Sequence, residues 1–427
     1  MLVGSQVRRV AIVGGSRIPF VRAMGAYAEC SNLDMLAAAL QGLVDRFGLQ
    51  GQRLGDVGAG AVLKHPRDFN LTREAVLSTT LAPETPAFDL QRACGTSLET
   101  AILLGLKIAH GQIDSAIAAG VDTASDAPIG VSERLRKLLL RSARGRTLGE
   151  RLGPWLDLRP AHFKPNLPAV AEPRTGLSMG QSCELMAQRW SIPREAQDRL
   201  ALESHQRAAA AYDAGFYRDL IVPYQGVEAD NNLRRDTTLE KLAKLKPAFA
   251  MNGQGTLTAG NSTPMTDGAA AVLLASEDWA RERGLPVLAY LTYGKVAAVD
   301  FVHDEGLLMA PAYAVPRMLA DANRQLQDFD FYEIHEAFAA QVLCTLAAWE
   351  LPDFCRDRLG RSAPLGAIDR ARLNVKGGSL AVGHPFAATG ARILATLAKA
   401  IDERGGGRGL VSICTAGGMG VTAIVEK

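Results

Sequence analysis

Two reactive side chains stand at the start of helix-like segments. Cys94 precedes an apolar segment with helical spacing at 97–109, and the neighbouring Gly95 permits close approach of a ligand. His384 lies between glycines in "GGSLAVGHPFAATG", before a second such segment at 389–403. Unpaired N–H groups and the helix dipole at a helix start lower a thiol pKa. The sequence therefore indicates a thiolate nucleophile at Cys94. The alternative interpretations are that Cys94 is a small buried side chain and that His384 is a structural histidine in a turn.

Two further candidates follow strand-like segments. His335 and Glu336 come after "FDFYEI", and Cys414 ends the buried-strand pattern "GLVSIC". The glycine-rich "CTAGG" turn after that strand exposes backbone N–H groups that can form an oxyanion hole. Glu336 is expected to be an ordinary acidic residue in the first turn of a helix. The small residues of "CGTS" leave room for a flat thioester at Cys94.

Bulk properties exclude several classes of protein. The chain has 427 residues, enough for two or three domains, and a net charge of only +2, which gives no general attraction to nucleic acid. No apolar run has the length of a membrane span, and the N-terminus has too few apolar residues for a secretory signal. Six scattered cysteines without a C-x-x-C pair argue against a disulfide framework and a zinc site. We expect a cytoplasmic protein in a reducing interior.

Strand-like and helix-like segments alternate along most of the chain, which predicts an α/β architecture with largely parallel strands. The alternation stops at 123–250, where the sequence is helical, basic and interrupted by prolines. We therefore expect an N-terminal half made of 1–122 and 251–280. An inserted helical domain at 123–250 would interrupt it, and a C-terminal half would span 281–427.

The two halves repeat one plan. Each has a reactive residue, a helix, a glycine turn and a buried strand in the same order, which places Cys94 and His384 at equivalent helix starts. Other expected elements are a helix at 32–49 that ends near Gly48 and a strand at 287–298. The helix at 97–109 is expected to bury one face, made of Leu98, Ala101, Ile102, Leu106 and Ala109.

Over essentially its whole length the sequence resembles the thiolases. The segments that carry the resemblance are "TAGNSTPMTDGAA", "HEAFA", "GGSLAVGHPFAATGAR" and "SICTAGGMG", in the order found in that family. "HEAFA", "AKLKPAF", "NLPAVAE" and "LLMAPAYAVPRML" are most similar to the beta subunit of the fatty-acid trifunctional enzyme. The resemblance implies the thiolase fold, with two duplicated βαβαβαββ halves in a layered αβαβα arrangement and an inserted helical loop domain.

The resemblance also implies a 3-ketoacyl-CoA thiolase of fatty-acid β-oxidation. Cys94 would take the acyl group as a thioester, after His384 accepts its proton. Cys414 would move the proton at the α-carbon, and His335 would complete the enolate-binding oxyanion hole through a held water. The backbone N–H groups of Cys94 and Ala416 would form the second hole. Coenzyme A and acyl-CoA would be substrates, with no permanently bound cofactor and no metal.

For coenzyme A, the resemblance implies a nucleotide contact from Arg234 and pantetheine contacts from Met179, Thr263 and Phe338. The sequence is equally consistent with a solvated charge at Arg234 and a core side chain at Phe338.

Two alanines depart from the glycines usual in the family. Ala387 is expected to tighten the turn behind His384, and Ala416 can still donate its N–H if its φ is negative. The rival functions are an acetoacetyl-CoA-specific biosynthetic thiolase, a β-ketoacyl synthase of the same fold, and a non-catalytic acyl-CoA- or lipid-binding protein. Cys414 in "CTAGG" and the retention of all four reactive side chains favour a catalytic thiolase.

The segment 132–156 combines seven Arg and Lys residues with leucines. Its ordinary interpretation is a solvated helix face, and the alternatives are a peripheral membrane contact, a partner-subunit contact or part of the coenzyme A phosphate site. The resemblance implies a homodimer or homotetramer and a hydratase/dehydrogenase subunit of a β-oxidation complex as a further partner. No nucleic-acid partner is expected.

Overall fold

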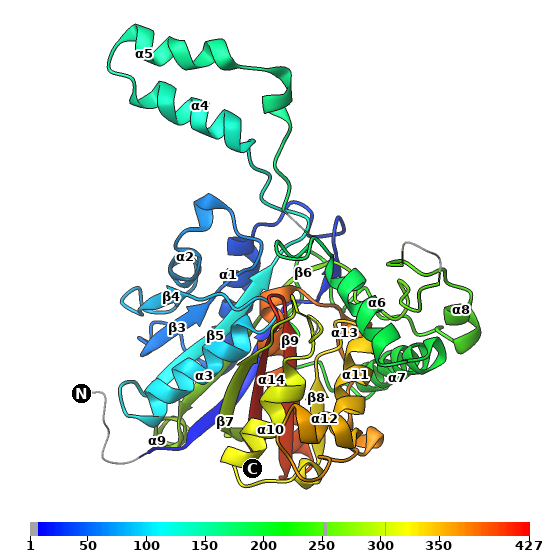
Figure 1. Ribbon diagram of the computed structural model, residues 1–427. Coiled ribbons are helices and arrows are strands. Elements are labelled where there is room, and N and C mark those ends of the chain that lie inside the picture. The colour runs from blue at the N-terminus through cyan, green and yellow to red at the C-terminus, as the bar shows by residue number, and fades with distance from the viewer. Residues whose placement is uncertain (1–6, 169, 251–253, 304) are drawn as a thin grey trace.

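The computed structural model describes residues 7–168, 170–250, 254–303 and 305–427 (Figure 1). Its strands are β1 Val10–Arg17, β2 Val21–Arg22, β3 Asp56–Ala59, β4 Ala87–Asp89, β5 Ser115–Asp122, β6 Thr266–Ser276, β7 Ala289–Ala298, β8 Phe331–Ile334, β9 Arg408–Thr415 and β10 Met419–Glu426. They form one sheet in the order β4-β3-β5-β6-β1-β7-β10-β9-β8, with β2 beside β6. Only two residue pairs join β1 to β7, so the sheet consists of two half-sheets with a narrow seam.

The two half-sheets have the same topology. The order β3-β5-β6-β1 in the first half matches β8-β9-β10-β7 in the second, with one parallel pairing followed by two antiparallel pairings in each. β4 pairs in parallel with β3, and at the equivalent place in the second half Leu373 forms a single parallel bridge to Tyr332. The predicted duplication is confirmed.

The helices form layers around these half-sheets. The central layer is α3 Thr96–Ala109 and α14 Thr389–Glu403, which pack on each other and contact both half-sheets. α1 Asn32–Phe47, α2 Leu71–Leu77 and α9 Glu277–Glu282 pack on the first half-sheet, and α10 Pro311–Asp321 packs on the second, next to α11 Ala339–Glu350 and α12 Pro352–Asp357. The layered αβαβα arrangement is therefore confirmed, and it places the N-terminal ends of α3 and α14 together.

Most predicted element boundaries agree with the structure, and one predicted face does not. The helix expected at 32–49 is α1, which ends at Gly48 with a φ of 62° that favours glycine. Leu106, expected in the buried face of α3, is 51% exposed. The buried stripe instead runs through Leu98, Ala101, Leu104 and Ile108, because α3 contacts half-sheets on two sides as well as α14.

The segment 123–250 is helical, and its described part contains no strand. It holds α4 Glu133–Arg144, α5 Leu148–Leu152, α6 Met179–Arg189, α7 Arg194–Asp213 and α8 Leu239–Ala243. α4 and α5 form an arm that stands away from the body, whereas α6 and α7 pack against α11 and α7 also contacts the short helix α13, Ser379–Val382 (Figure 1). The domain boundaries proposed from sequence stay a prediction. Short 3₁₀ turns cover Pro66–Asp68, Gly153–Asp157, Pro160–Phe163, Leu326–Asp328, Arg370–Arg372 and Phe386–Ala388.

Within the ranges described above, no helix is both long enough and apolar enough to cross a membrane.

Candidate active site

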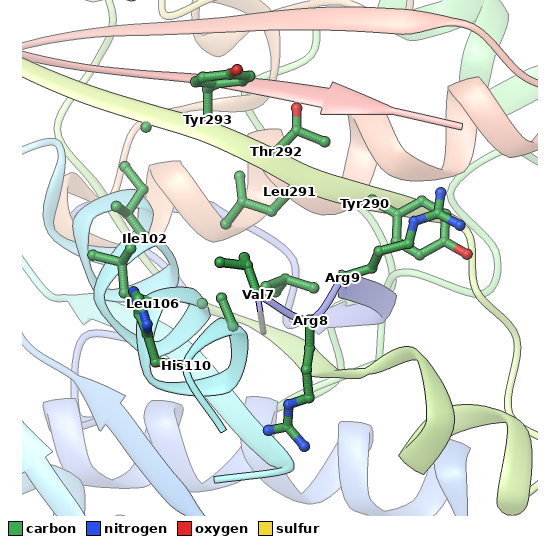
Figure 2. Close-up of a pocket in the computed structure, with 14 residues that line it drawn as sticks. Val7, Arg8, Arg9, Ile102, Leu106, His110, Tyr290, Leu291, Thr292 and Tyr293 are labelled. Carbon is green, nitrogen blue, oxygen red and sulfur yellow. The ribbon is translucent and has the colours of Figure 1, made fainter. Parts of the chain in front are cut away.

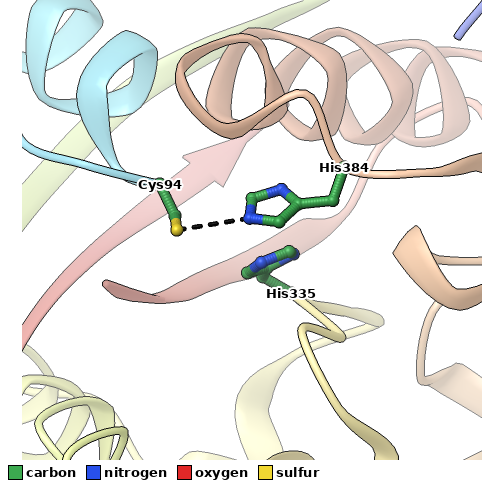
Figure 3. Close-up of side chains that lie close together, drawn as sticks. All are labelled: Cys94, His335 and His384. Atoms are coloured by element: carbon green, nitrogen blue, oxygen red, sulfur yellow. Dashed lines mark hydrogen bonds between the residues drawn. The ribbon is translucent and has the colours of Figure 1, made fainter. Parts of the chain in front are cut away.

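Cys94 and His384 face each other between the N-terminal ends of α3 and α14. His384 Nε2 lies 3.2 Å from Cys94 Sγ (Figure 3). The other ring nitrogen, Nδ1, lies 2.6 Å from Oγ1 of Thr389, the first residue of α14. Gly383 before the histidine has a φ of 103°, which explains the need for glycine there. The structure thus brings together the two residues that the sequence placed at equivalent positions of the repeat.

The pKa values of this pair correct one expectation. Burial raises the pKa of the Cys94 thiol to about 12, although the N–H groups of Ala416 and Cys94 itself act in the opposite direction. Desolvation of the sulfur therefore outweighs the helix start, and the expected thiolate is wrong for the ligand-free protein. Burial lowers the pKa of His384 to about 3, with a further contribution from Arg392. The resting pair is a neutral thiol and a neutral imidazole, so attack by Cys94 requires His384 to accept its proton.

Buried hydrogen bonds fix the turn that follows His384. Ser97 Oγ, on α3, donates to the carbonyl of Ala387 at 2.5 Å and accepts from Ala391 N at 2.8 Å. The Asp122 carboxylate accepts from Ala387 N at 2.7 Å. A Cβ on Gly120 would lie 2.0 Å from the Ala387 carbonyl oxygen, so glycine there allows the turn to approach β5. Ala387 therefore fits this turn without displacing a reacting group.

His335 lies beside His384. It follows β8, its N–H donates to the Ser412 carbonyl at 2.8 Å, and its ring centroid is 4.1 Å from that of His384 (Figure 3). The side chain is almost completely buried, and desolvation together with the nearby His384 and Arg392 holds its pKa well below the usual range. Nδ1 lies 2.9 Å from Ser379 Oγ. Nε2 has no hydrogen-bond partner among the described residues.

Cys414 occupies the end of β9 with a buried thiol. Burial, and then the neighbouring Cys94, raise its pKa well above the usual range. It belongs to an apolar cluster that also contains Phe338, with Met179 packed against it. A protonated thiol near Cys94 can deliver a proton, and the thiolate that it leaves can take one back.

The turn after Cys414 points an amide at the nucleophile. The N–H of Ala416 hydrogen-bonds to Cys94 Sγ, and Ala416 has a negative φ. The following residues, Gly417 and Gly418, have φ values of 76° and 68° and make the reversal. The N–H of Gly417 donates to Glu172 Oε1 at 2.7 Å, so a side chain from the segment 123–250 holds this turn.

The predicted coenzyme A contacts lie in two places. Met179 is the first residue of α6, Phe338 caps α11, and Thr263 donates from N and Oγ1 to the Ala337 carbonyl, all on the Cys414 side of the site. Arg234 is on a separate loop, where its N–H donates to His205 Nδ1 at 3.2 Å. The structure therefore groups three of the four residues, and Arg234 is not among the neighbours of the reactive thiols.

A donor set for a metal ion coincides with the reactive cluster. One ligand atom from each of Cys94, His335 and His384 lies within 4.8 Å of the others. A thiolate and two imidazoles are ligands that zinc accepts. Each imidazole directs Nδ1 to a hydroxyl, so the Nε2 atoms face the cluster, that of His384 toward the Cys94 sulfur and that of His335 without a partner among the described residues. Metal binding here would occupy the nucleophile, so the expectation of chemistry without a metal stays a prediction.

Comparison with known proteins identifies the family. A model of the thiolase N-terminal domain matches residues 10–278, and a model of the thiolase C-terminal domain matches residues 285–427. The chain belongs to the thiolase family. A 3-ketoacyl-CoA thiolase of Yersinia pestis (strain Pestoides F) is 42% identical over 100% of this chain and 98% of its own length.

Solved thiolase structures have the same fold. The Bacillus anthracis acetyl-CoA acetyltransferase superposes with a TM-score of 0.82 at 29% identity, over 99% of this chain and 100% of its own. The human mitochondrial 3-ketoacyl-CoA thiolase in complex with CoA gives a TM-score of 0.80 at 28% identity, over 100% and 99% of the two chains.

Several residues of this thiolase site were not found from the sequence. Glu336 is buried, precedes α11 rather than lying in its first turn, and accepts from Ser204 Oγ, Asn374 Nδ2 and Leu380 N. The expectation of an ordinary acidic residue in the first turn of a helix is wrong. Ser379 and Thr389 were also missed, and they hydrogen-bond to the rings of His335 and His384. Asp122, Glu172 and Arg392 were missed as well, and they hydrogen-bond to Ala387 N, Gly417 N and Ser379 Oγ around the reactive groups. The sequence carries no signal for them, because the burial of Arg392 and its bond to Ser379 appear only in the folded chain.

Proposed function

We propose that this chain is a 3-ketoacyl-CoA thiolase, which uses coenzyme A to cleave a 3-ketoacyl-CoA into acetyl-CoA and a shortened acyl-CoA. The observation that carries the proposal is the Cys94 thiol 3.2 Å from His384 Nε2, with the Ala416 N–H directed at the same sulfur. The Yersinia pestis relative carries the name 3-ketoacyl-CoA thiolase, and a human mitochondrial 3-ketoacyl-CoA thiolase of this fold was solved with CoA, which supports this class of substrate.

In the first half-reaction the Cys94 sulfur attacks the 3-keto carbon while His384 Nε2 accepts the thiol proton. The N–H groups of Cys94 and Ala416 stabilise the resulting oxyanion. The carbon–carbon bond then breaks, the acyl group stays on Cys94, and the electron pair leaves as the enolate of acetyl-CoA. His335 stabilises that enolate oxygen, through the held water expected from the family, and Cys414 protonates the α-carbon.

In the second half-reaction coenzyme A displaces the acyl group. Its thiol gives a proton to the Cys414 thiolate left by the first half-reaction and attacks the Cys94 thioester. Collapse of the tetrahedral intermediate releases acyl-CoA, and the Cys94 sulfur recovers its proton from His384. Met179, Thr263 and Phe338 would contact the pantetheine arm and Arg234 the nucleotide. The same steps in reverse form a carbon–carbon bond by Claisen condensation.

The test is thiolysis of acetoacetyl-CoA and of a long-chain 3-ketoacyl-CoA by the purified protein. Wild type is expected to cleave the long-chain substrate and to carry an acyl adduct on Cys94 by mass spectrometry. Cys94→Ala is expected to lose both. Absence of cleavage and adduct in folded wild-type protein supplied with free coenzyme A would contradict the proposal.

A biosynthetic role is the second candidate. It is favoured by the structural match to the Bacillus anthracis acetyl-CoA acetyltransferase. An enzyme that cleaves only acetoacetyl-CoA in the same assay would decide for it. The retained set of reactive side chains disfavours a non-catalytic acyl-CoA- or lipid-binding role.

We propose a homodimer that covers an apolar groove of about 330 Å³ between α3, β7 and the start of β1 (Figure 2). Ile102, Leu106 and Leu291 line the groove, and Tyr293 on β7 is 40% exposed nearby. Exposed leucines on a central helix are costly in a monomer. Leu106→Asp is expected to shift the protein to monomer in light scattering, with Leu239→Asp as the exposed control on α8. A tetramer in the same measurement would indicate a second interface.

The arm of α4 and α5 is proposed to contact an anionic membrane surface. Its segment 132–156 has seven basic and two acidic residues, and Leu140, Leu148 and Leu152 are exposed beside them. Co-sedimentation with anionic but not with neutral vesicles, lost at high salt, is expected. A hydratase/dehydrogenase subunit is the other proposed partner of this arm, and capture of that purified subunit without vesicle binding would decide for it.

We propose a cytoplasmic enzyme that needs no bound metal and no permanent cofactor. Dialysis against EDTA is expected to leave thiolysis unchanged. Lost activity that Zn²⁺ restores would contradict this.

A further inference from the structure

The buried ring of His335 presents an unsatisfied nitrogen to the reactive cluster. Nε2 has no hydrogen-bond partner in the described part of the chain, although the residue is 1% exposed. One ring nitrogen of His335 lies within 4.8 Å of Cys94 Sγ and of a ring nitrogen of His384, and the two ring centroids are 4.1 Å apart. Figure 3 shows the three side chains together. A buried polar atom without a partner costs free energy and marks a place for a ligand group. Whether this nitrogen donates or accepts depends on which tautomer the ring adopts.

The hydrogen bonds at the opposite nitrogen fix that tautomer. Arg392 NH2 donates to Ser379 Oγ at 2.7 Å, and Ser379 Oγ lies 2.9 Å from His335 Nδ1. A guanidinium has donors only, so the serine oxygen accepts from Arg392 and keeps its own hydrogen to donate. Among the described residues, His335 Nδ1 is the acceptor in reach of that hydroxyl. Nδ1 of His335 is therefore the unprotonated ring nitrogen.

A neutral imidazole has one hydrogen, so the hydrogen of His335 lies on Nε2. The ring is neutral because burial and the nearby His384 and Arg392 hold its pKa well below the usual range. Arg392 is itself buried in α14, close to the buried carboxyl groups of Glu333 and Glu336 and to Tyr217 and Arg17. A guanidinium keeps its proton even there, so the donor to Ser379 is permanent.

His384 has the opposite arrangement. Its Nε2 faces the Cys94 thiol and must be bare to accept a proton, so Nδ1 carries the hydrogen and donates to Thr389 Oγ1. The two rings, 4.1 Å apart, thus present different groups to one pocket: a lone pair from His384 and an N–H from His335. The hydroxyl groups of Ser379 and Thr389 thus hold the two neutral imidazoles in opposite tautomers, one with its hydrogen on Nε2 and the other with its hydrogen on Nδ1.

We propose that Ser379 and Arg392 are positioning residues that hold His335 in the Nε2–H tautomer, so that its N–H donates toward the enolate oxygen through the held water of the proposed mechanism. This inference rests on the proposed thiolase function. Without the serine hydroxyl, the ring hydrogen can move to Nδ1, and a lone pair then faces that water in place of an N–H donor. Carbon–carbon cleavage needs the enolate, whereas exchange of an acyl group between Cys94 and coenzyme A does not.

The experiment has a spectroscopic part and a kinetic part. Wild-type protein labelled with ¹⁵N-histidine is examined by long-range ¹H–¹⁵N correlation, in which protonated and bare ring nitrogens are distinct. The chain has seven histidines, and the His335 signals are identified by their loss in His335→Asn. We expect Nε2–H in wild type and in Ser379→Thr, which keeps the hydroxyl, and a shift toward Nδ1–H in Ser379→Ala.

In the kinetic part, Ser379→Ala is expected to lower kcat for cleavage by about 10²-fold, the usual effect of losing one oxyanion donor, with little change in KM. Exchange of labelled coenzyme A into acetyl-CoA is expected to persist, and Ser379→Thr is expected to restore cleavage. Ser412→Ala is the matched control, because Ser412 is also buried and its backbone carbonyl accepts from His335 N, whereas its hydroxyl has no hydrogen-bond partner among the described residues.

Three results would overturn the inference. They are Nδ1–H at His335 in wild type, an unchanged tautomer and kcat in Ser379→Ala, and equal loss of exchange and cleavage in that variant. Failure of the proposed function is a different result, since wild type would then cleave no 3-ketoacyl-CoA while its tautomer remained measurable. The wild-type spectrum also decides the question if Ser379→Ala does not fold.

Discussion

Cys94 and His384 are separated by 290 positions in the chain, and yet the sulfur of one lies 3.2 Å from Nε2 of the other. Each belongs to a different copy of the duplicated fold, at the N-terminal end of a central helix. The contact exists because α3 and α14 cross closely there: a Cβ on Gly390 would lie 2.4 Å from Leu98 N. The catalytic pair is therefore a product of how the two halves pack.

Cys414→Ala is expected to separate the two half-reactions. Carbon–carbon cleavage should fall by about 10²- to 10⁴-fold, the range for loss of a general acid or base. Exchange of labelled coenzyme A with acetyl-CoA should decline less, because in that step Cys414 only moves the proton of the coenzyme A thiol, which is far more acidic than the α-carbon. Radiolabel exchange and the loss of 3-ketoacyl-CoA absorbance measure the two rates. A parallel loss of both would assign Cys414 to packing, which circular dichroism and melting temperature would reveal.

Acid should destabilise the fold through His384. Its pKa is about 3 in the folded chain against an ordinary 6.5, so the unfolded chain binds more protons between these pH values. Stability contributed by the neutral ring is present above pH 6.5 and is lost as the pH falls toward 3, at up to about 1.4 kcal/mol per pH unit. Urea titrations at several pH values in this range give the free energy of unfolding. Its slope against pH should be smaller in His384→Gln than in wild type. Equal slopes would contradict the burial of an uncharged ring.

Glu172 is expected to support the turn that carries the Ala416 amide. Glu172→Ala removes the acceptor of the Gly417 N–H and should lower kcat by about 10-fold, the effect of one hydrogen bond of about 1.4 kcal/mol. Glu172→Gln keeps an oxygen acceptor and should retain most of the activity. Steady-state kinetics with both variants tests this. An equal defect in Gln and Ala would mean that the charge, not the hydrogen bond, is required.

Gly120→Ala should destabilise the protein. The new Cβ would lie 2.0 Å from the backbone oxygen of Ala387, and backbone cannot move aside as a side chain can. We expect a loss of about 1–3 kcal/mol, as for overpacking of a buried site, and reduced activity because the displaced turn follows His384. Chemical denaturation and thiolysis measure both effects. Gly149→Ala is the control, because it lies on the exposed arm and the nearest atom to its new Cβ, Thr147 Oγ1, is 4.0 Å away.

The sequence was sufficient for the parts of the site that local signals encode. Cys94, His384, His335 and Cys414 each follow a recognisable strand or begin a recognisable helix, and the order of the repeat predicted that the first two would meet. The predicted buried face of α3 is wrong at Leu106, because helical spacing does not show which sides of a helix other layers of the fold cover.

Tertiary properties were out of reach of the sequence. The pKa of Cys94 depends on desolvation by the second half of the chain, which helix position alone cannot report. Ser379 and Arg392 act through hydrogen bonds whose partners are set by packing, and serine and arginine are common residues on protein surfaces. Glu172 lies in a segment without regular structure, so no periodicity marked it.

The division of the site between two copies of one fold also sets an order of events during synthesis. Cys94 leaves the ribosome early, but His384 and Cys414, the proposed base and the proposed second thiol of the reaction, are encoded near the end of the chain. A nascent or truncated polypeptide therefore carries a cysteine without a partner and performs no acyl transfer. In the proposed mechanism, acyl transfer begins only after α14 has packed on α3, so a chain becomes active only when both halves have been synthesised and folded.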